Sequence, residues 1–360
     1  AVSRLREDIQ VKLVEGEGIA QRWLVDDVGL SAEAARQLLE YCAEQVAGFG
    51  LMPTQRQLAM ERFFDESGST HLVIHAPFGS RINKAWGLAL RKRFCRSFNF
   101  ELQAAATVHR TASGGDAGGD IVWHVWGERA EGDAPLVLFH GGSGSWMHWI
   151  RNIQDLVAAG KQVWAVDLPG FGDSVAPPVG GDADAIVEPL YESMRELFGL
   201  QACDLVGFSF GGMTAGMLLA AHPEVARQLV LVGAPAMGVV PHRQFELKAW
   251  RHLPPAQQLE AHRFNLGALM LLDASLIEGL ALSTHVANVV RDRMQRRRLA
   301  HTDILARSLP QVTCPVHAIY GESDSLYKAW IAALEQAYAD AAPDFRGFEL
   351  IANAGHWVQF

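Results

Sequence analysis

The chain has 360 residues, of which 49% are hydrophobic and 20% are charged, a composition typical of a globular protein. This length is enough for one large domain with a smaller one, or for two domains. Residues 1–106 carry 13 basic and 13 acidic residues, so the net charge of −9 belongs to residues 107–360. An acidic second region argues against nonspecific nucleic-acid binding there.

Cysteine spacing and hydropathy exclude several classes of protein. The four cysteines are scattered without C-x-x-C spacing, so neither a zinc site nor a disulfide framework is expected. No apolar run approaches the ~18 residues of a membrane span, and the N-terminus is charged rather than signal-like. We therefore expect a cytoplasmic protein without membrane contact. The chain begins without Met and stops at Phe360, and we expect both ends to be cut.

The first region combines helix and strand patterns. Ser31, followed by Glu33, predicts a capped helix start, and helical apolar spacing continues from Ala34 to Val46. Three further elements are expected: a strand at residues 71–75, a basic helix at 84–98 and a strand at 99–104. His71 and His75 lie on one face of their strand, but no third ligand is evident, so we expect no metal site.

Several short motifs of the first region occur in a familiar order. They are Leu51-Met52-Pro53-Thr54, Glu61-Arg62-Phe63, His75 to Arg81 and Ala85 to Leu90. Over about 60 residues they resemble the accessory region of the large Lhr-type ATP-dependent helicases. In that family the region lies beyond the two motor domains and helps to hold single-stranded DNA. The resemblance implies DNA contacts at the Pro77-to-Arg81 turn and at Trp86.

The residues themselves leave two interpretations of this basic stretch open. In the first interpretation Trp86 stacks on a base of single-stranded nucleic acid, next to a cationic face. The cationic residues are Arg81, Lys84, Arg91, Lys92, Arg93 and Arg96. Alternatively, the stretch is a solvated basic helix with Trp86 in the core. No G-x-x-x-x-G-K-[ST] loop occurs in the chain, so we expect no helicase activity. We place the end of this α+β fragment at residue 106 and the start of the next domain at 107.

The second region alternates strand and helix patterns. A Gly-rich turn at residues 111–120 separates two short strands, and further apolar runs follow. Strands are predicted at residues 121–126, 135–139, 162–166, 203–208, 228–232, 316–320 and 347–351. Apolar strands separated by helices indicate a mostly parallel, doubly wound sheet covered on both faces. In such sheets the chemistry gathers at the carboxyl ends of the strands.

Five motifs each follow one of these strands. Gly207-Phe208-Ser209-Phe210-Gly211 fits G-x-S-x-G, a sharp turn from strand to helix in which a Cβ on either glycine would collide with backbone. The other four are His140-Gly141-Gly142, Asp167 to Ser174, Gly321-Glu322-Ser323-Asp324 and Gly355-His356-Trp357. Over about 250 residues this set resembles the α/β-hydrolase superfamily, which implies that fold and a helical cap.

The resemblance implies a role for each residue of a catalytic triad. Ser209 would be the nucleophile, Asp324 the acid and His356 the base, and backbone N–H groups of Phe210 and Gly142 would hold the oxyanion. Each role also has a chemical reason. A serine hydroxyl needs a base to remove its proton, histidine titrates near neutral pH, and a carboxylate fixes the imidazole tautomer.

Other interpretations of the same residues remain open. Glu322 could be the acid, with Asp324 a surface turn residue, and His356 could be a hydrogen-bonded loop histidine. We expect His140 to order its own loop, and Asp167 and Asp173 to be structural.

An insertion between two predicted strands, about residues 237–309, is interpreted as the cap. Helices are predicted there at residues 245–251, 255–264, 275–282 and 288–298. The candidates for lining a substrate pocket are Trp250, Phe264, Met270 and Leu271, although each could belong to the cap's own core. The arginine run at residues 291–298 is interpreted as a solvated helix face.

These features lead to three functional hypotheses. The main one is a cofactor-independent, carboxylesterase-like serine hydrolase that acts on an ester or related acyl substrate through an acyl-enzyme. The alternatives are a carbon–carbon bond hydrolase for ring-fission products, similar in its Gly355-His356-Trp357 ending, and a nucleic-acid-binding fragment at residues 51–106. Family members continue past the histidine into a last helix. We expect its absence here to lower stability or activity.

Overall fold

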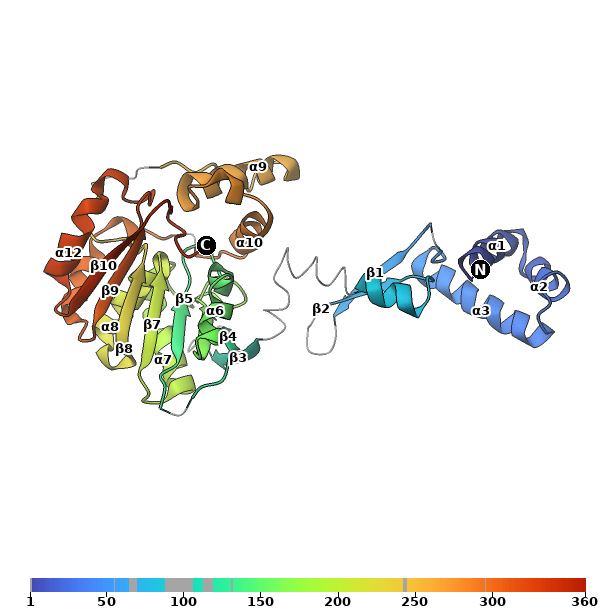
Figure 1. Cartoon of the computed structure of the whole chain (residues 1–360), viewed down its shortest axis with the longest axis horizontal. Helices are drawn as coiled ribbons and strands as arrows, with labels where there is room; N and C mark the ends of the chain where they lie inside the picture. Colours follow the sequence, from blue (N-terminus) through green and yellow to red (C-terminus); the bar gives the residue numbers. More distant parts are fainter. Residues whose placement is uncertain are drawn as a thin grey trace. The chain divides into compact units, whose positions relative to one another are not determined.

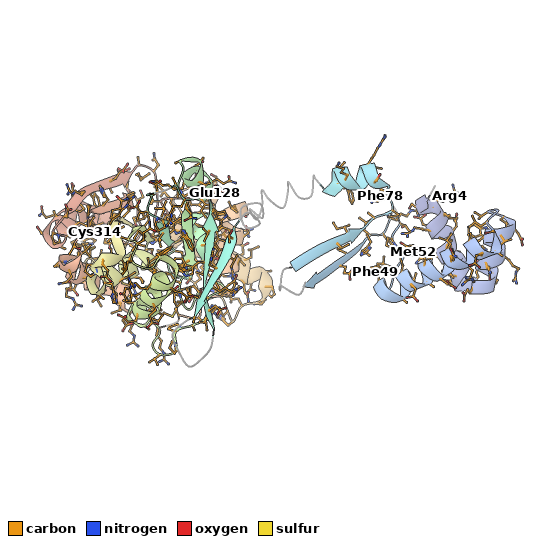
Figure 2. All side chains as sticks on the ribbon, turned by 90° about the horizontal axis from the view of Figure 1, so that it is seen from below. Arg4, Phe49, Met52, Phe78, Glu128 and Cys314 are labelled. Carbon is orange, nitrogen blue, oxygen red and sulfur yellow. The ribbon has the colours of Figure 1, made fainter. Side chains whose placement is uncertain are left out.

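The computed structural model describes residues 2–54, 56–64, 70–87, 106–112, 119–130, 132–241, 245–294 and 296–360. The chain divides into two compact units, residues 1–93 and 94–360. Phe49 and Met52 belong to the first unit and Cys314 to the second (Figure 2). The predicted boundary is at residue 106, 13 residues after the observed division at residue 93. Residues 88–105, before the predicted boundary, lie outside the described part. Among the described residues, no helix combines the length and apolar composition needed to cross a membrane.

The first unit begins with three helices that share one core. They are α1 (Val2–Glu15), α2 (Glu17–Asp26) and α3 (Ala32–Phe49). The buried side chains between them include Ile9, Leu24, Leu39, Cys42 and Met52. α3 confirms the helix predicted at residues 34–46, and the Ser31 hydroxyl caps it by accepting the N–H of Ala34 at 3.2 Å.

An antiparallel hairpin completes the described part of this unit. β1 (Ala59–Phe64) pairs with β2 (Thr70–His75), which confirms the strand predicted at residues 71–75. Residues 80–87 are helical, and they include the start of the basic helix predicted at residues 84–98. The rest of that helix and the strand predicted at residues 99–104 lie outside the described residues.

An eight-stranded sheet is the centre of the second unit (Figure 1). The strand order is β10-β9-β8-β7-β5-β6-β4-β3. The strands are β3 (Thr107–Ala112), β4 (Asp120–Trp126), β5 (Leu136–Phe139), β6 (Val163–Asp167), β7 (Cys203–Phe208), β8 (Ala226–Val232), β9 (Val316–Gly321) and β10 (Phe345–Ile351). β3–β4 and β4–β6 pair antiparallel, and the other pairs are parallel. All seven strands predicted between residues 121 and 351 are confirmed, with ends within two residues of the prediction.

Both faces of the sheet are buried, because successive residues of a strand point to opposite sides. In β5, Val137 and Phe139 belong to one core, and Leu136 and Leu138 belong to another. Four helices pack on the first core: α7 (Val187–Phe198), α8 (Phe210–Ala221), α11 (Ile304–Ser308) and α12 (Leu334–Ala341). α6 (Ile153–Ala158) and part of the cap pack on the second. A groove of about 560 Å³ runs along β8, β9 and β10, where Val230 and Ile319 are half-buried.

The cap lies between β8 and β9, and its described part contains two main helices. α9 (Pro255–Asn265) confirms one predicted helix, and α10 (Gly279–Val289) begins within another. Figure 1 shows α9 and α10 together at one end of the sheet, on the side where the chain ends. The helix predicted at residues 275–282 is interrupted, because a 3-10 turn ends at Leu276 and α10 starts at Gly279 with φ of 54°.

Two of the helix predictions for the cap are wrong. Residues 245–250 are irregular, because the side-chain amide of Asn265 bonds both the N–H and the C=O of Lys248, at 2.7 and 2.9 Å. α10 ends at Val289, and the described residues after it, 290–294 and 296–298, do not form the helix predicted at 288–298. Other acceptors take the backbone N–H groups there: the Gly170 carbonyl bonds Arg293 at 2.9 Å, and Asp182 bonds Arg298.

The arginine run is therefore not a solvated helix face. Arg291 pairs with Asp173 at 2.8 Å, and Arg293 donates to the carbonyl of Gly172 at 3.0 Å. Arg297 pairs with Asp292 at 2.9 Å. Arg297 also donates to the hydroxyl of Ser143, in the loop after β5, at 3.0 Å. These guanidinium groups attach the cap to loops of the sheet domain, an arrangement that the charge pattern of the sequence does not predict.

Candidate active site

The turn after β7 is as sharp as the G-x-S-x-G pattern predicts. Ser209 has φ of 51° and ψ of −120°, a conformation that non-glycine residues adopt only where the surroundings hold it. A Cβ on Gly207 would lie 2.5 Å from Cα of Gly212, and a Cβ on Gly211 would lie 2.4 Å from the His140 carbonyl oxygen. Both glycines are therefore required for strand, turn and helix to pack this closely.

The structure brings Ser209, His356 and Asp324 together at the carboxyl ends of three strands. Nε2 of His356 lies 2.9 Å from Oγ of Ser209, and Nδ1 lies 2.9 Å from Oδ2 of Asp324. In the tautomer that satisfies both contacts, Nδ1–H donates to the carboxylate and the serine hydroxyl donates to Nε2. This arrangement can draw the proton from Ser209 when its oxygen attacks an electrophile.

The environment of Asp324 differs from that of Glu322. Asp324 is fully buried, and its Oδ1 also accepts the N–H of Leu326 at 2.9 Å. Glu322 is exposed. Of the two carboxylates considered from the sequence, only Asp324 lies at hydrogen-bond distance from His356.

The cap supports the loop that carries His356. The N–H of Trp357 donates to the Met270 carbonyl at 2.8 Å, and its indole N–H donates to the His148 carbonyl at 3.0 Å. Trp357 and Met270 are both buried in the core beneath the cap. The position of the imidazole therefore depends on contacts with residues far away in the sequence.

The two expected oxyanion donors lie beside the serine. Phe210 is the first residue of α8, so its N–H has no acceptor within the helix. Gly141 donates its N–H to Nδ1 of His148 at 3.1 Å, whereas no acceptor among the described residues takes the N–H of Gly142. The Gly142 and Phe210 N–H groups are therefore left for a ligand.

Two buried histidines shape this loop. Nδ1 of His140 lies 2.7 Å from the Gly141 carbonyl, and Nε2 accepts the N–H of Leu168 at 2.9 Å. His140 thus orders its own loop, as its sequence position suggests.

Burial lowers the pKa of His140 to about 4. The pKa of His148 lies well below its usual range, mainly because of burial and secondly because of the neighbouring histidines. Both rings are neutral at neutral pH, which lets each act as a hydrogen-bond acceptor. The sequence does not single out His148, because nothing in its local pattern places it beside Gly141.

A cavity of about 550 Å³ opens beside the oxyanion loop under the cap, a size suited to a small-molecule ligand. Of the four predicted lining residues, Trp250 and Met270 line this cavity. Phe264 does not: its side chain is 44% exposed, and the Lys248 ammonium lies 4.0 Å from its ring centroid. Leu271 does not line it either, because it is buried in the core. Other lining residues are Gly142, Ser143, His148, Asn265, His285 and Asp292. A second cavity of about 280 Å³ lies beside Tyr327. Neither lining includes Ser209 or His356, and of the two cavities only the first reaches Gly142.

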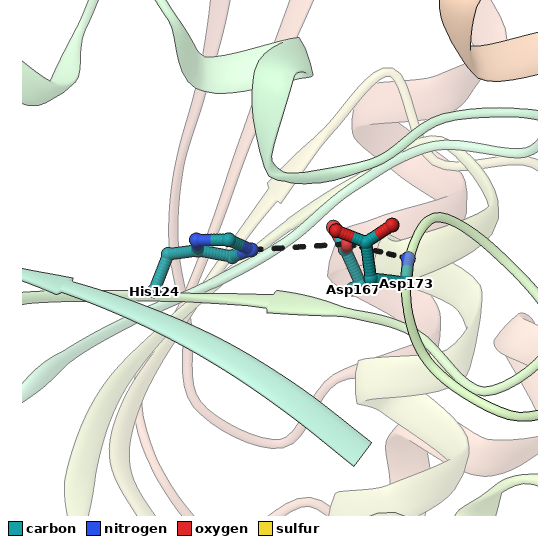
Figure 3. Close-up of side chains that lie close together, drawn as sticks. All are labelled: His124, Asp167 and Asp173. Carbon is teal, nitrogen blue, oxygen red and sulfur yellow. Dashed lines mark hydrogen bonds and ion pairs between the residues drawn. The ribbon is translucent and has the colours of Figure 1, made fainter. Parts of the chain in front are cut away.

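Three of the described residues lie close enough together that their side chains could bind one metal ion. The ligand atoms of His124, Asp167 and Asp173 lie within 4.8 Å of one another (Figure 3). Both oxygens of Asp167 are already used, because Oδ1 accepts the N–H of Trp146 and Oδ2 accepts that of Asp173, each at 2.9 Å. Burial by itself raises the pKa of Asp167, but His124, His140 and the Asp173 N–H offset this effect and keep the pKa below its usual range. The ionised carboxylate braces the loop after β6.

The residues considered for nucleic-acid contact lie in the first unit. Trp86 is 43% exposed and packs edge-on against Phe78, with 5.5 Å between ring centroids. It is therefore not a core residue of the described part. Arg81 is exposed. His75 lies 3.2 Å from Glu61, and its ring contacts Phe49.

Two family models match parts of the chain. Residues 134–266 match the model described as alpha/beta hydrolase fold, and residues 52–112 match the model described as DEAD/H associated.

Curated relatives and solved structures resemble the second unit. A 2-hydroxy-6-oxononadienedioate/2-hydroxy-6-oxononatrienedioate hydrolase from Pseudomonas sp. is 26% identical over 68% of this chain and 88% of its own length. A 2-hydroxy-6-oxo-6-phenylhexa-2,4-dienoate hydrolase from Burkholderia cepacia is 26% identical over 65% and 84%. A carboxylesterase from Bacillus subtilis has a TM-score of 0.57 at 19% identity, over 74% and 91% of the two chains. A meta-cleavage product hydrolase from Pseudomonas fluorescens IP01 has a TM-score of 0.53 at 21%, over 69% and 90%.

Proposed function

We propose that this chain, which has the α/β-hydrolase fold, is a hydrolase that uses Ser209 to cleave a carbon–carbon bond next to a carbonyl group. The observation that carries the proposal is the unbroken chain of hydrogen bonds from Asp324 through His356 to Ser209. Support for the type of bond comes from the two curated relatives named above, whose names describe hydrolases of 2-hydroxy-6-oxo acids. Hydrolysis of an ester, the main hypothesis from the sequence, is the second candidate function.

The proposed reaction begins with attack by Oγ of Ser209 on the carbonyl carbon. The serine proton passes to Nε2 of His356, and Asp324 stabilises the imidazolium that forms. The carbonyl oxygen becomes an anion, which the N–H groups of Gly142 and Phe210 would bind. Collapse of this intermediate breaks the bond to the leaving carbon, which takes the proton from His356. Water, deprotonated by His356, then attacks the acyl carbon. The bond from that carbon to Oγ breaks, and His356 returns the proton to Ser209.

The leaving group decides between the two substrate types. A carbanion leaves only where conjugation with a second carbonyl spreads its charge. A 2-hydroxy-6-oxo-dienoate provides that conjugation in its keto form, in which the 2-hydroxyl proton has moved to C5 before the attack by Ser209. An ester loses an alkoxide and needs no such support. The cavity of about 550 Å³ accepts polar and apolar groups together, because Trp250 and Met270 line it alongside Asn265 and His285. The proposed steps use water and the side chains and backbone N–H groups of this chain.

A direct comparison of substrates tests the proposal. We expect kcat/KM for 2-hydroxy-6-oxo-6-phenylhexa-2,4-dienoate to exceed that for p-nitrophenyl butyrate by at least about tenfold, a difference of about 1.4 kcal/mol in transition-state binding. Loss of dienoate absorbance and release of nitrophenolate are the measurements. Fluorophosphonate labelling with peptide mapping should find the label on Ser209. A preference for the ester would favour the second candidate, and absence of both activities and of the label would reject the serine mechanism.

We further propose that the first unit binds single-stranded DNA weakly. The match to the DEAD/H-associated model and the exposure of Arg81 and Trp86 support this role. In fluorescence anisotropy of the whole chain with an oligothymidine, binding should weaken as salt rises from 50 to 200 mM. Trp86→Ala should lower the affinity about tenfold, the effect of losing one stacked base. Trp330→Ala is the control, because Trp330 is 39% exposed and lies in the second unit. No salt-sensitive binding at micromolar protein would contradict the proposal.

A further inference from the structure

The segment at the end of α10 and after it is hydrogen-bonded to the loop that follows β5. The buried hydroxyl of Ser145 donates to Oδ1 of Asn288 at 2.7 Å. The hydroxyl of Ser143 donates to Oδ2 of Asp292 at 2.5 Å. The cap therefore contacts the same loop that carries Gly142.

Arg297 completes this connection. Its Nη2 donates to Oδ2 of Asp292 at 2.9 Å and to Oγ of Ser143 at 3.0 Å. The Asp292 side chain is 10% exposed and that of Arg297 is 25% exposed, so water screens this ion pair less than one on the open surface. The three side chains form a closed ring of hydrogen bonds around the Ser143 hydroxyl.

The backbone of Ser143 needs such support. Its φ of 53° lies in the left-handed region, which non-glycine residues occupy at an energetic cost. Surrounding contacts must therefore hold this conformation, and the bonds to Asp292 and Arg297 do so. Because Ser143 follows Gly142 directly, these contacts restrain the Gly142–Ser143 peptide. Through the backbone dihedrals of Gly142 they also limit the direction of its N–H group.

Arg297 also lies beside the two residues that carry the expected oxyanion donors. A Cβ added to Gly142 would lie 2.9 Å from Nη1 of Arg297 and 3.6 Å from Cβ of Phe210. The guanidinium carbon lies 5.3 Å from the ring centroid of Phe171 and 5.8 Å from that of Phe210. Nη1 is buried and has no hydrogen-bond partner among the described residues. The guanidinium thus lies beside the Gly142 backbone and the Phe210 side chain.

We propose that Arg297, Asp292 and Ser143 are positioning residues that aim the Gly142 N–H at the oxyanion, which makes the cap part of the catalytic geometry. This inference rests on the proposed function, because only a serine-type reaction forms the oxyanion. The Gly142 N–H binds more strongly to an anion than to a neutral carbonyl. Misplacing it therefore slows the chemical step more than it weakens substrate binding.

Substitution of Arg297 gives the first test. Arg297→Met keeps a long apolar stem but removes the cation and its hydrogen bonds. We expect kcat to fall about 10- to 100-fold, part of the value of one oxyanion donor, with KM changed less than about threefold. Arg297→Lys should recover part of the loss, because an ammonium group can still pair with Asp292. Arg291→Met is the matched control, since Arg291 lies in the same segment but pairs with Asp173 at 2.8 Å.

A trifluoromethyl ketone separates positioning from a general structural effect. Oγ of Ser209 adds to its carbonyl carbon, the serine proton passes to Nε2 of His356, and the ketone oxygen becomes the bound oxyanion. We expect Arg297→Met to weaken this inhibitor by the same factor as kcat. A competitive inhibitor without a reactive carbonyl should bind as tightly as it does to the unmodified chain.

The outcomes distinguish this inference from the proposed function. Unchanged kcat and ketone affinity in Arg297→Met overturn the inference, as does a raised KM with an unchanged kcat. If the unmodified chain forms no ketone adduct at Ser209, the serine mechanism itself is rejected. Should Arg297→Met fail to fold, Ser143→Ala provides the second variant, because it removes one hydroxyl only. A lower kcat and weaker ketone binding in Ser143→Ala support the inference, and unchanged values overturn it.

Discussion

Ser209→Ala is expected to lower kcat by about 10⁵- to 10⁶-fold on both the dienoate and the nitrophenyl ester. The variant keeps His356 and Asp324 in place but has no atom that can attack the carbonyl carbon. The turn itself should survive, because alanine retains Cβ and the glycines at positions 207 and 211 are unchanged. Steady-state turnover and thermal melting measure the two properties separately.

An exposed serine of the cap offers a matched control for this variant. Ser275 is exposed and is absent from the lining of the cavity beside Gly142, so Ser275→Ala should keep full turnover. If Ser209→Ala retained more than a few per cent of the original kcat, Ser209 would have to be removed from the nucleophilic role. Fluorophosphonate labelling should disappear in Ser209→Ala and persist in Ser275→Ala.

Asp324→Asn is expected to lower kcat by about 10⁴-fold while leaving the fold intact. The amide has nearly the size of the carboxylate, but its NH₂ group would face Nδ1 of His356, which lies 2.9 Å from Oδ2 in the present structure. Nδ1 would then be an acceptor, so the proton of the neutral ring would sit on Nε2 and face Oγ of Ser209. A protonated Nε2 cannot take the serine proton. Comparison of kcat on the two substrates, with melting curves, measures this effect.

Glu322→Gln controls for the loss of a negative charge near this loop. Glu322 is exposed and lies two residues from Asp324, so its neutralisation should change kcat less than about twofold. A large loss in Glu322→Gln together with a small loss in Asp324→Asn would reverse the assignment of the acid. That result would restore the alternative that the sequence leaves open.

Much of the sheet domain could be predicted because its signals are local. Each strand is a short apolar run bounded by turn residues, and the observed ends differ from the predicted ones by at most two residues. The G-x-S-x-G turn is also a local property, since a Cβ on either flanking glycine collides with backbone. Parallel pairing then brings the strand ends to one edge, and so places Ser209, Asp324 and His356 close together.

The cap was predicted less well because its backbone follows distant partners. Residues 245–250 have helical apolar spacing, yet Asn265 takes the polar groups of Lys248. Helix α10 stops at Val289 although the pattern continues, since later N–H groups bond to the Gly170 carbonyl and to Asp182. Intrinsic propensity is a weak preference, and such contacts override it. The same limit explains why Phe264 and Leu271 could not be separated from Trp250 and Met270 as candidate lining residues.

The sequence by itself determined the type of fold, the order of the strands along the chain and the residues at the strand ends. These follow from hydrophobic periodicity and from backbone sterics, which act over a few residues. Only the tertiary structure decided which carboxylate meets His356, how His148 and Trp357 hold the loops, and that Arg297 lies against Gly142. Most of those contacts join residues that are far apart along the chain, such as Trp357 and His148, and their distances depend on how whole layers pack.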